Sequence, residues 1–147
     1  MADSRFVYVT YIRATPAKVW EALTTSEFMK SYFFGASFDT DWKAGSPWRM
    51  VHSDGRVTDS GEIEEISAPE RLVLTWRSEW LAEAKDEGYS QLVAEVEDVN
   101  GVTKLSVTHA IAVEGSKLIQ AVSGGWPRIL SNLKSVLETG SAVFASK

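Results

Sequence analysis

The stretch Gly124-Gly125-Trp126-Pro127-Arg128-Ile129-Leu130 lies in the middle of the longest apolar pattern of this chain. The pattern consists of Leu118, Ile119, Val122, Trp126, Ile129, Leu130, Leu133, Val136 and Leu137. Spacings of three and four residues place these side chains along one side of a helix, which we predict over about residues 115–139. The two glycines and Pro127, which lacks a backbone N–H, predict a kink or a restart of that helix near residues 123–127.

The chain before this helix is rich in strand patterns. An early strand is predicted over Arg5–Arg13 from its Val, Tyr, Phe and Ile content. Further strands are predicted over about residues 36–41, 47–53, 56–66, 71–80, 89–99 and 102–112. The dipeptides Asp54-Gly55 and Asn100-Gly101 are strong hairpin signals. Strands that follow one another as hairpins indicate an antiparallel sheet.

Two short helices are predicted between the first strand and the others. Thr15 is a good N-cap residue, and Pro16 suits the first helical position. Ser26 is expected to cap a second helix that runs through Phe34 and ends at Gly35. The order is therefore β, α, α, six β, α, which predicts an α+β fold. The long helix, about 37 Å at 1.5 Å per residue, must cross the sheet, and a helix held by a curved sheet leaves a cavity.

Alternation along the strands predicts which side chains face the helix. The predicted inward residues are Leu72, Leu74 and Trp76; Trp48, Met50 and His52; Val57, Gly61 and Ile63; Leu92, Ala94 and Val96; and Leu105, Val107 and His109. The same alternation sends Glu62 and Glu64 to the solvent face, where they would not form a catalytic carboxylate pair.

Composition limits the class of protein. With 147 residues, 44% hydrophobic and 24% charged, the chain is expected to form one domain over residues 1–147. No run approaches the length of a membrane span, and the start Met-Ala-Asp-Ser-Arg lacks the order of a signal peptide. The absence of cysteine fits a reducing compartment. A net charge of −5 argues against nucleic acid as a partner. We therefore expect a cytoplasmic protein without stable membrane insertion.

Several segments together resemble a known family. They are Pro16–Thr24, Gly61–Ile66, Pro69–Trp76, Thr108-His109, and Gly125-Trp126-Pro127 followed by Leu130, Leu133 and Leu137. From about residue 7 to 139 the chain is similar to the activators of heat-shock-protein-ninety ATPase, within the START-like or Bet v 1-like (SRPBCC) superfamily. The resemblance implies a helix-grip fold, in which a curved antiparallel sheet of six or seven strands wraps around a long C-terminal helix. Two short helices follow the first strand.

The resemblance implies several functions. Members of the superfamily bind lipids, sterols, hormones or polyketides in the cavity, and a few catalyse cyclisation or condensation there. The namesake domain stimulates a chaperone ATPase as part of a larger protein and implies a role in the stress response. We expect this chain to be that domain alone.

The predicted site is the cavity between the sheet and the long helix. The residues expected to line it are Trp48, Met50, His52, Trp76, His109, Trp126, Ile129 and Leu133. His52 and His109 would be its polar handles and are the candidates for a catalytic acid or base. Two histidines on separate strands do not make a metal site, so neither a metal nor another cofactor is expected. The charged segment between Glu79 and Ser90 is expected to form a flap at the cavity mouth.

Three functions fit these features. We favour a protein, not an enzyme, that binds a small hydrophobic molecule. The second is a protein-interaction module that acts on a chaperone or another partner. The third is an enzyme of the cyclase or dehydratase kind that uses one cavity histidine. Either a monomer or a homodimer is compatible with the sequence, because the edge strand at residues 36–41 is free to pair with a second copy.

Overall fold

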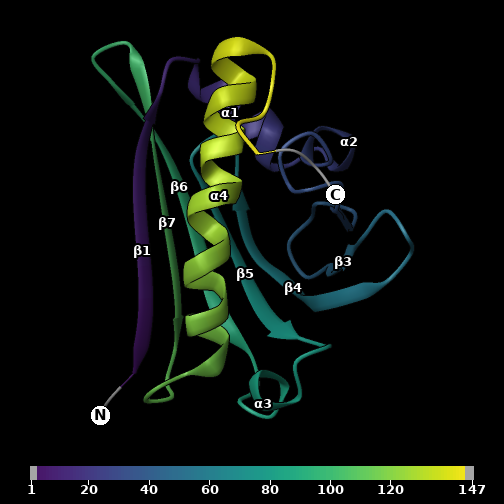
Figure 1. The fold of residues 1–147 in the computed structure, drawn as a ribbon. Coiled ribbons are helices and arrows are strands. Elements are labelled where there is room, and N and C mark those ends of the chain that lie inside the picture. The colour runs from purple at the N-terminus through teal and green to yellow at the C-terminus, as the bar shows by residue number, and fades with distance from the viewer. Residues whose placement is uncertain (1–2, 145–147) are drawn as a thin grey trace.

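The computed structural model describes residues 3–144 and shows a sheet with a long C-terminal helix across one face (Figure 1). In chain order the elements are β1 (Ser4–Ile12), α1 (Pro16–Leu23), α2 (Ser26–Met29), β2 (Ser37–Asp39), β3 (Pro47–Val51), β4 (Val57–Ser67), β5 (Arg71–Ser78), α3 (Ala82–Lys85), β6 (Ser90–Val99), β7 (Val102–Ile111) and α4 (Lys117–Thr139). The predicted strand ends lie within two residues of those observed. Helix α3 is an addition to the predicted order.

The sheet has seven antiparallel strands in the order β1-β7-β6-β5-β4-β3-β2. It curves around α4, and α1 and α2 lie together near the C-terminal end of α4 (Figure 1). The sheet is open, with β1 at one edge and the three-residue β2 at the other. This arrangement confirms the predicted α+β helix-grip fold.

Helix α4 runs from Lys117 to Thr139 without interruption, so the predicted restart near residues 123–127 is wrong. Its ends follow common capping chemistry. The Ser116 hydroxyl accepts a hydrogen bond from the Ile119 N–H at 3.1 Å, and Gly140 adopts a left-handed conformation with φ 90°. The helix thus accommodates Pro127 at the loss of one backbone hydrogen bond. A kink at this position stays a prediction.

The two short helices differ in how well the sequence predicts them. Helix α1 begins as expected, with the Thr15 hydroxyl accepting from the Lys18 N–H at 3.2 Å. The prediction for α2 is wrong at both ends. Its N-cap is Thr25, and the Ser26 hydroxyl donates instead to the Phe38 carbonyl on β2. The helix ends at Met29, well before the predicted Phe34.

Most strand side chains point as alternation predicts, with Glu62 and Glu64 exposed and Ile63 buried. Val57 is the exception, because it is exposed where we expect it inside. The pairing of β3 with β4 shifts register between Met50 and Val51, next to the first residue of β4. This irregularity changes the orientation of the strand end, so that Thr58 and the following Asp59 are both buried there.

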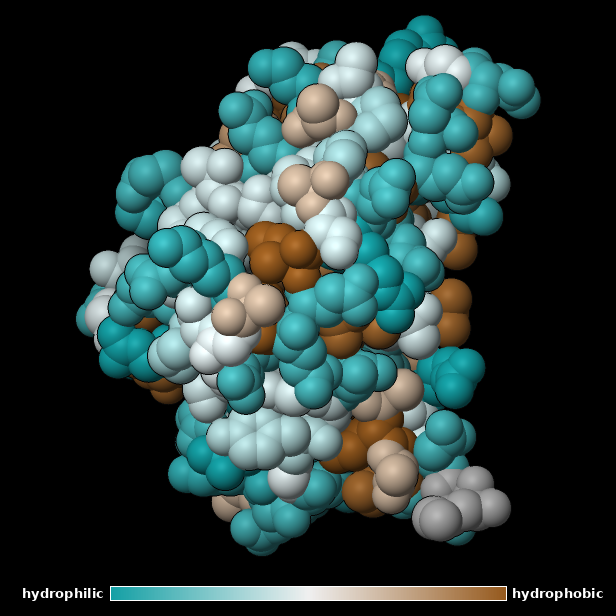
Figure 2. Space-filling model, turned by 180° about the vertical axis from the view of Figure 1, so that it is seen from behind, coloured by the Kyte–Doolittle hydropathy of each residue, from teal (hydrophilic) through white to brown (hydrophobic). Residues whose placement is uncertain are grey.

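The face of the sheet that points away from α4 is largely hydrophilic (Figure 2). The edge strand β1 carries three exposed apolar side chains at alternating positions: Val7, Val9 and Tyr11. Within residues 3–144, no helix combines the length and the apolar composition that a membrane crossing requires.

Gly61 marks the closest approach of two strands. A Cβ at this position would lie 1.9 Å from the Thr75 carbonyl oxygen on β5. That same oxygen accepts a hydrogen bond from Trp48 Nε1 at 2.9 Å. The Trp48 ring also stacks on Phe38, with 4.3 Å between the ring centroids. The missing side chain at Gly61 therefore lets a buried tryptophan of β3 reach across β4 to the backbone of β5.

Gly61→Ala should lower the free energy of unfolding by about 3 kcal/mol, the upper part of the usual range for overpacking, because backbone must move to relieve the contact. Urea denaturation measures this change. Gly124→Ala is the matched control: position 124 is exposed on α4, and a Cβ there meets nothing within 4 Å. The control should stabilise by about 0.5–1 kcal/mol. Equal stability of the two variants would contradict this account of Gly61.

Candidate functional site

A cavity of about 390 Å³ lies between the first half of α4 and the inner faces of β3, β4 and β5. Helix α3 and the two residues before it line one side of the cavity. Phe33 and Phe34, from the turn after α2, line another. The wall is mainly apolar, and its polar members gather at the β3–β4 end: His52, Arg56, Thr58, Asp59 and Ser78.

The structure brings five of the eight sequence-predicted lining residues together around this cavity: Met50, His52, Trp76, Trp126 and Ile129. The other three are buried in the core and do not line it. Trp48 lies beside Trp76 with 4.6 Å between ring centroids. Leu133 is fully buried farther along α4, and His109 contacts the rings of Trp76 and Trp126 from the β7 side.

His109 joins α4 to the sheet through a hydrogen-bonded chain. Its Nδ1 accepts from Trp126 Nε1 at 3.1 Å, and its Nε2 lies 2.7 Å from the Ser90 hydroxyl. That hydroxyl donates to the Trp76 carbonyl at 2.8 Å, so it accepts from His109. An indole nitrogen can only donate, so this imidazole is neutral with its proton on Nε2. Burial agrees, because it lowers the pKa of His109 to about 3.

His109 therefore offers no free ring nitrogen to a molecule in the cavity. The second histidine, His52, is half-buried at the cavity wall, and its Nε2 lies 2.8 Å from the Thr58 hydroxyl. Of the two predicted polar handles, only His52 reaches the cavity surface.

Asp59 is the carboxyl among the cavity residues that the sequence analysis does not predict. It lies on β4 opposite Met50 and Ser78, is only 9% exposed, and its Oδ2 accepts from Trp76 Nε1 at 2.8 Å. Burial raises the pKa of this carboxyl above its usual range, against the smaller opposing effects of its hydrogen bonds and of His52. Alternation contains the signal for it, since Asp59 has the same parity as Gly61 and Ile63.

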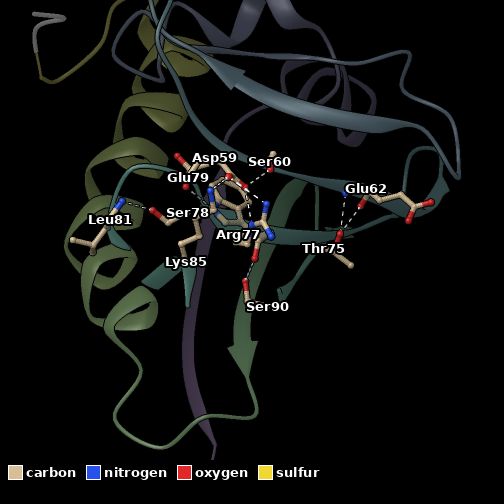
Figure 3. Close-up of polar contacts among 11 residues, drawn as sticks. Asp59, Ser60, Glu62, Thr75, Arg77, Ser78, Glu79, Leu81, Lys85 and Ser90 are labelled. Atoms are coloured by element: carbon tan, nitrogen blue, oxygen red, sulfur yellow. Dashed lines mark hydrogen bonds and ion pairs between the residues drawn. The ribbon is translucent and has the colours of Figure 1, made fainter. Parts of the chain in front are cut away.

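A second carboxyl near the mouth has the opposite character. Glu79 follows β5 and accepts from the Ser60 hydroxyl at 2.6 Å and from Arg77 Nε at 2.8 Å (Figure 3). Lys85 of α3 lies 3.2 Å from its other oxygen. The bond from Arg77 is the main reason that the pKa of Glu79 falls to about 2. Glu79 is thus a charged, paired carboxylate, whereas Asp59 is not paired with a cation.

The predicted flap over residues 79–90 contains α3 and is attached at both sides. Trp80, Leu81 and Ala84 line the cavity, and Trp80 is 67% exposed at its rim. Beyond α3, the Glu87 carboxylate accepts from the Ser116 hydroxyl and from the Lys117 N–H, both at 2.6 Å. Glu87 thereby binds the first turn of α4, where a negative charge is favourable.

A comparison with models of protein families places this chain in a known family. Residues 13–138 match the family described as "Activator of Hsp90 ATPase homolog 1-like protein". The chain belongs to this family. The match confirms the resemblance drawn from the sequence. A comparison with curated protein sequences gives no match.

Solved structures of similar fold come from several organisms. The Aha1 dimer from Colwellia psychrerythraea shares 18% identity with a TM-score of 0.76, over 93% of this chain and 98% of that one. An HSP90 activator from Plasmodium falciparum shares 22% identity with a TM-score of 0.75, over 90% and 95%. CalU16 from Micromonospora echinospora shares 19% identity with a TM-score of 0.76, over 95% and 77%. At these identities the likeness shows the helix-grip fold alone.

A metal site in this member of the Hsp90-activator-like family requires several ligand side chains close together. Within residues 3–144, no three His, Cys, Asp or Glu side chains lie close enough together to hold a metal ion. What the site offers is an apolar cavity with one buried acid, one half-buried histidine and several aromatic rings.

Because His109 is neutral in the folded protein, the free energy of unfolding should depend on pH. Between about pH 6.5 and the folded-state pKa of about 3, the unfolded chain binds a proton on this histidine and the folded chain does not. Stability therefore falls as the pH falls, with a His109 contribution of up to about 1.4 kcal/mol per pH unit. His109→Gln should lose this contribution, so its stability should depend less on pH between 6 and 5. Urea denaturation at both values measures the two slopes, and equal slopes would contradict the assignment.

Proposed function

We propose that this protein binds a small hydrophobic molecule in the cavity between the sheet and α4. The observation that carries the proposal is the cavity itself, a mainly apolar space of about 390 Å³ with aromatic walls. Small-molecule sites are commonly clefts of about 300–1,000 Å³ with apolar walls and a few polar groups. Net negative charge and the lack of cysteine fit a protein of the cytoplasm, which we include in the proposal.

The sequence of α4 supports the proposal because it leaves the cavity wall without a side chain at one position. Gly125 lines the cavity, and a Cβ built there meets nothing within 4 Å. A glycine inside a helix costs about 1 kcal/mol relative to alanine. At Gly125 the absence of a side chain leaves open space in the cavity next to Trp126, and this space could hold part of a ligand.

A second candidate is an interaction with a chaperone or another protein. Family membership favours it, as does the similarity in fold to an HSP90 activator from Plasmodium falciparum. The exposed apolar residues of β1 would then matter more than the cavity. For the reaction of a cyclase or dehydratase, His109 offers no free nitrogen, which leaves His52 as the candidate acid or base; we do not propose such a reaction.

Native mass spectrometry of gently purified protein tests the first proposal. We expect an excess mass that disappears when the same sample is denatured. Gly125→Leu should abolish the excess mass, because a Cβ at this lining position meets nothing within 4 Å and the rest of the side chain should occupy cavity space. Gly124→Leu introduces the same side chain one residue earlier, at an exposed position outside the cavity wall, and should retain it.

Two outcomes would contradict cavity binding. One is a bound molecule that remains on Gly125→Leu at the wild-type level. The other is a bare mass together with failure of neutral apolar probes such as 1-naphthylmethanol to bind the wild-type protein. In either case binding to a purified chaperone, which both leucine variants should then retain, becomes the favoured function.

A further inference from the structure

The Asp59 carboxyl is a buried acid without a cationic partner. Its Oδ2 accepts from Trp76 Nε1, and among residues 3–144 it takes part in no ion pair. Trp76 and Asp59 both line the cavity, which places this acid at the surface of a space that a ligand can occupy. Buried carboxylates are ordinarily paired or hydrogen-bonded on both oxygens, because an isolated buried charge is costly.

The cations near the cavity are held by other carboxylates. Arg56 lines the cavity, but its Nε lies 2.7 Å from Asp54 at the exposed β3–β4 turn. Arg77 and Lys85 both pair with Glu79. Within the described residues, Asp59 therefore has only neutral hydrogen-bond donors, the Trp76 indole and the neighbouring Thr58 hydroxyl, and forms no ion pair with an arginine or a lysine.

Aromatic rings complete the surroundings of this acid. The rings of Trp76 and Trp126 both line the cavity, with 5.6 Å between their centroids. Aromatic faces attract cations, most strongly where water is excluded. An acid bonded to one indole, with a second indole next to the first in the same cavity wall, is a suitable environment for an organic cation.

We propose that the ligand of this cavity is an apolar molecule that carries a protonated amine, with the ammonium bonded to Asp59 and packed against Trp76 and Trp126. This inference rests on the proposed function. The ammonium supplies the missing counter-charge through a charge-assisted hydrogen bond. The apolar body of the molecule occupies the space beside Gly125 and Ile129.

Isothermal titration calorimetry with three probes of one shape tests the inference at pH 7.5. The probes are 1-naphthylmethylamine, which is cationic, 1-naphthylmethanol, which is neutral, and 1-naphthoate, which is anionic. We expect the amine to bind at least about tenfold more tightly than the alcohol, and the naphthoate to bind least. An alcohol that binds as tightly as the amine overturns the amine proposal and leaves the proposed function standing. Failure of all three probes overturns the amine proposal, and together with a bare mass in native mass spectrometry it also contradicts the proposed function.

Asp59→Asn removes the charge and keeps an oxygen for the Trp76 indole. It should reduce the amine affinity to that of the alcohol and leave the alcohol affinity unchanged. Glu62→Gln is the matched control, because it removes one negative charge from the exposed face of the same strand. It should keep the amine preference. A preference that survives in Asp59→Asn overturns the proposal.

A pH series on the wild-type protein provides a measurement that needs no variant. As the pH falls, protonation of Asp59 removes its charge, so amine binding should weaken while alcohol binding persists. The other charged or titratable groups around Asp59 are His52, Arg56 and Glu79, and α4 adds none to the cavity wall. Repeating the series in His52→Gln assigns the titration. An amine preference that is constant from pH 7.5 to pH 4 contradicts the role of Asp59.

Discussion

The bond between the Trp126 indole and His109 holds the long helix against the sheet at one orientation. Apolar contacts alone would allow α4 to slide or roll across the inner surface. A buried donor and a buried acceptor meet only in one arrangement, and each would be left unsatisfied in any other. His109 is fully buried and passes the connection on through Ser90 to the backbone of β5. The cavity beside Trp126 takes its shape from this orientation.

The same chain of hydrogen bonds ends at the cavity. The backbone carbonyl of Trp76 accepts a hydrogen bond from the Ser90 hydroxyl, and the Trp76 indole donates one to Asp59. One tryptophan thus belongs both to the structural network and to the wall of the candidate site. Its neighbours Trp48 and Phe38 pack behind it and keep the ring in place. Trp76 therefore connects the polar end of the cavity to the buried core of the fold.

The sequence predicts the fold well because period and turn chemistry act locally. Hairpin dipeptides and strand alternation locate the sheet, and the spacing around Trp126 locates α4. The site is harder to predict, since side chains far apart in sequence decide it. His109 looks like a cavity residue until its two partners, Trp126 and Ser90, are known. Pocket residues in turns, such as Phe33 and Phe34 after α2, follow neither strand alternation nor helical spacing.

Errors in the prediction also have physical causes. Val57 has inward parity but lies next to a register shift, which alternation cannot foresee. Ser26 is a good capping residue, yet its hydroxyl finds a better acceptor on β2. Asp59 is not predicted, because an acid is unexpected on the inner face of a sheet; hydrogen bonds from the Trp76 indole and from Thr58 favour it there.

Glu87 gives the entrance of the cavity an energetic link to the helix. Its carboxylate occupies the amino end of α4, and the same segment carries Leu81 and Ala84 over the cavity. The segment cannot swing away without leaving the first N–H groups of α4 to water. Movement of this segment away from the cavity and loss of the Glu87 contacts at the helix start are therefore coupled, so the stability of a helix terminus also determines how firmly one wall of the cavity is held.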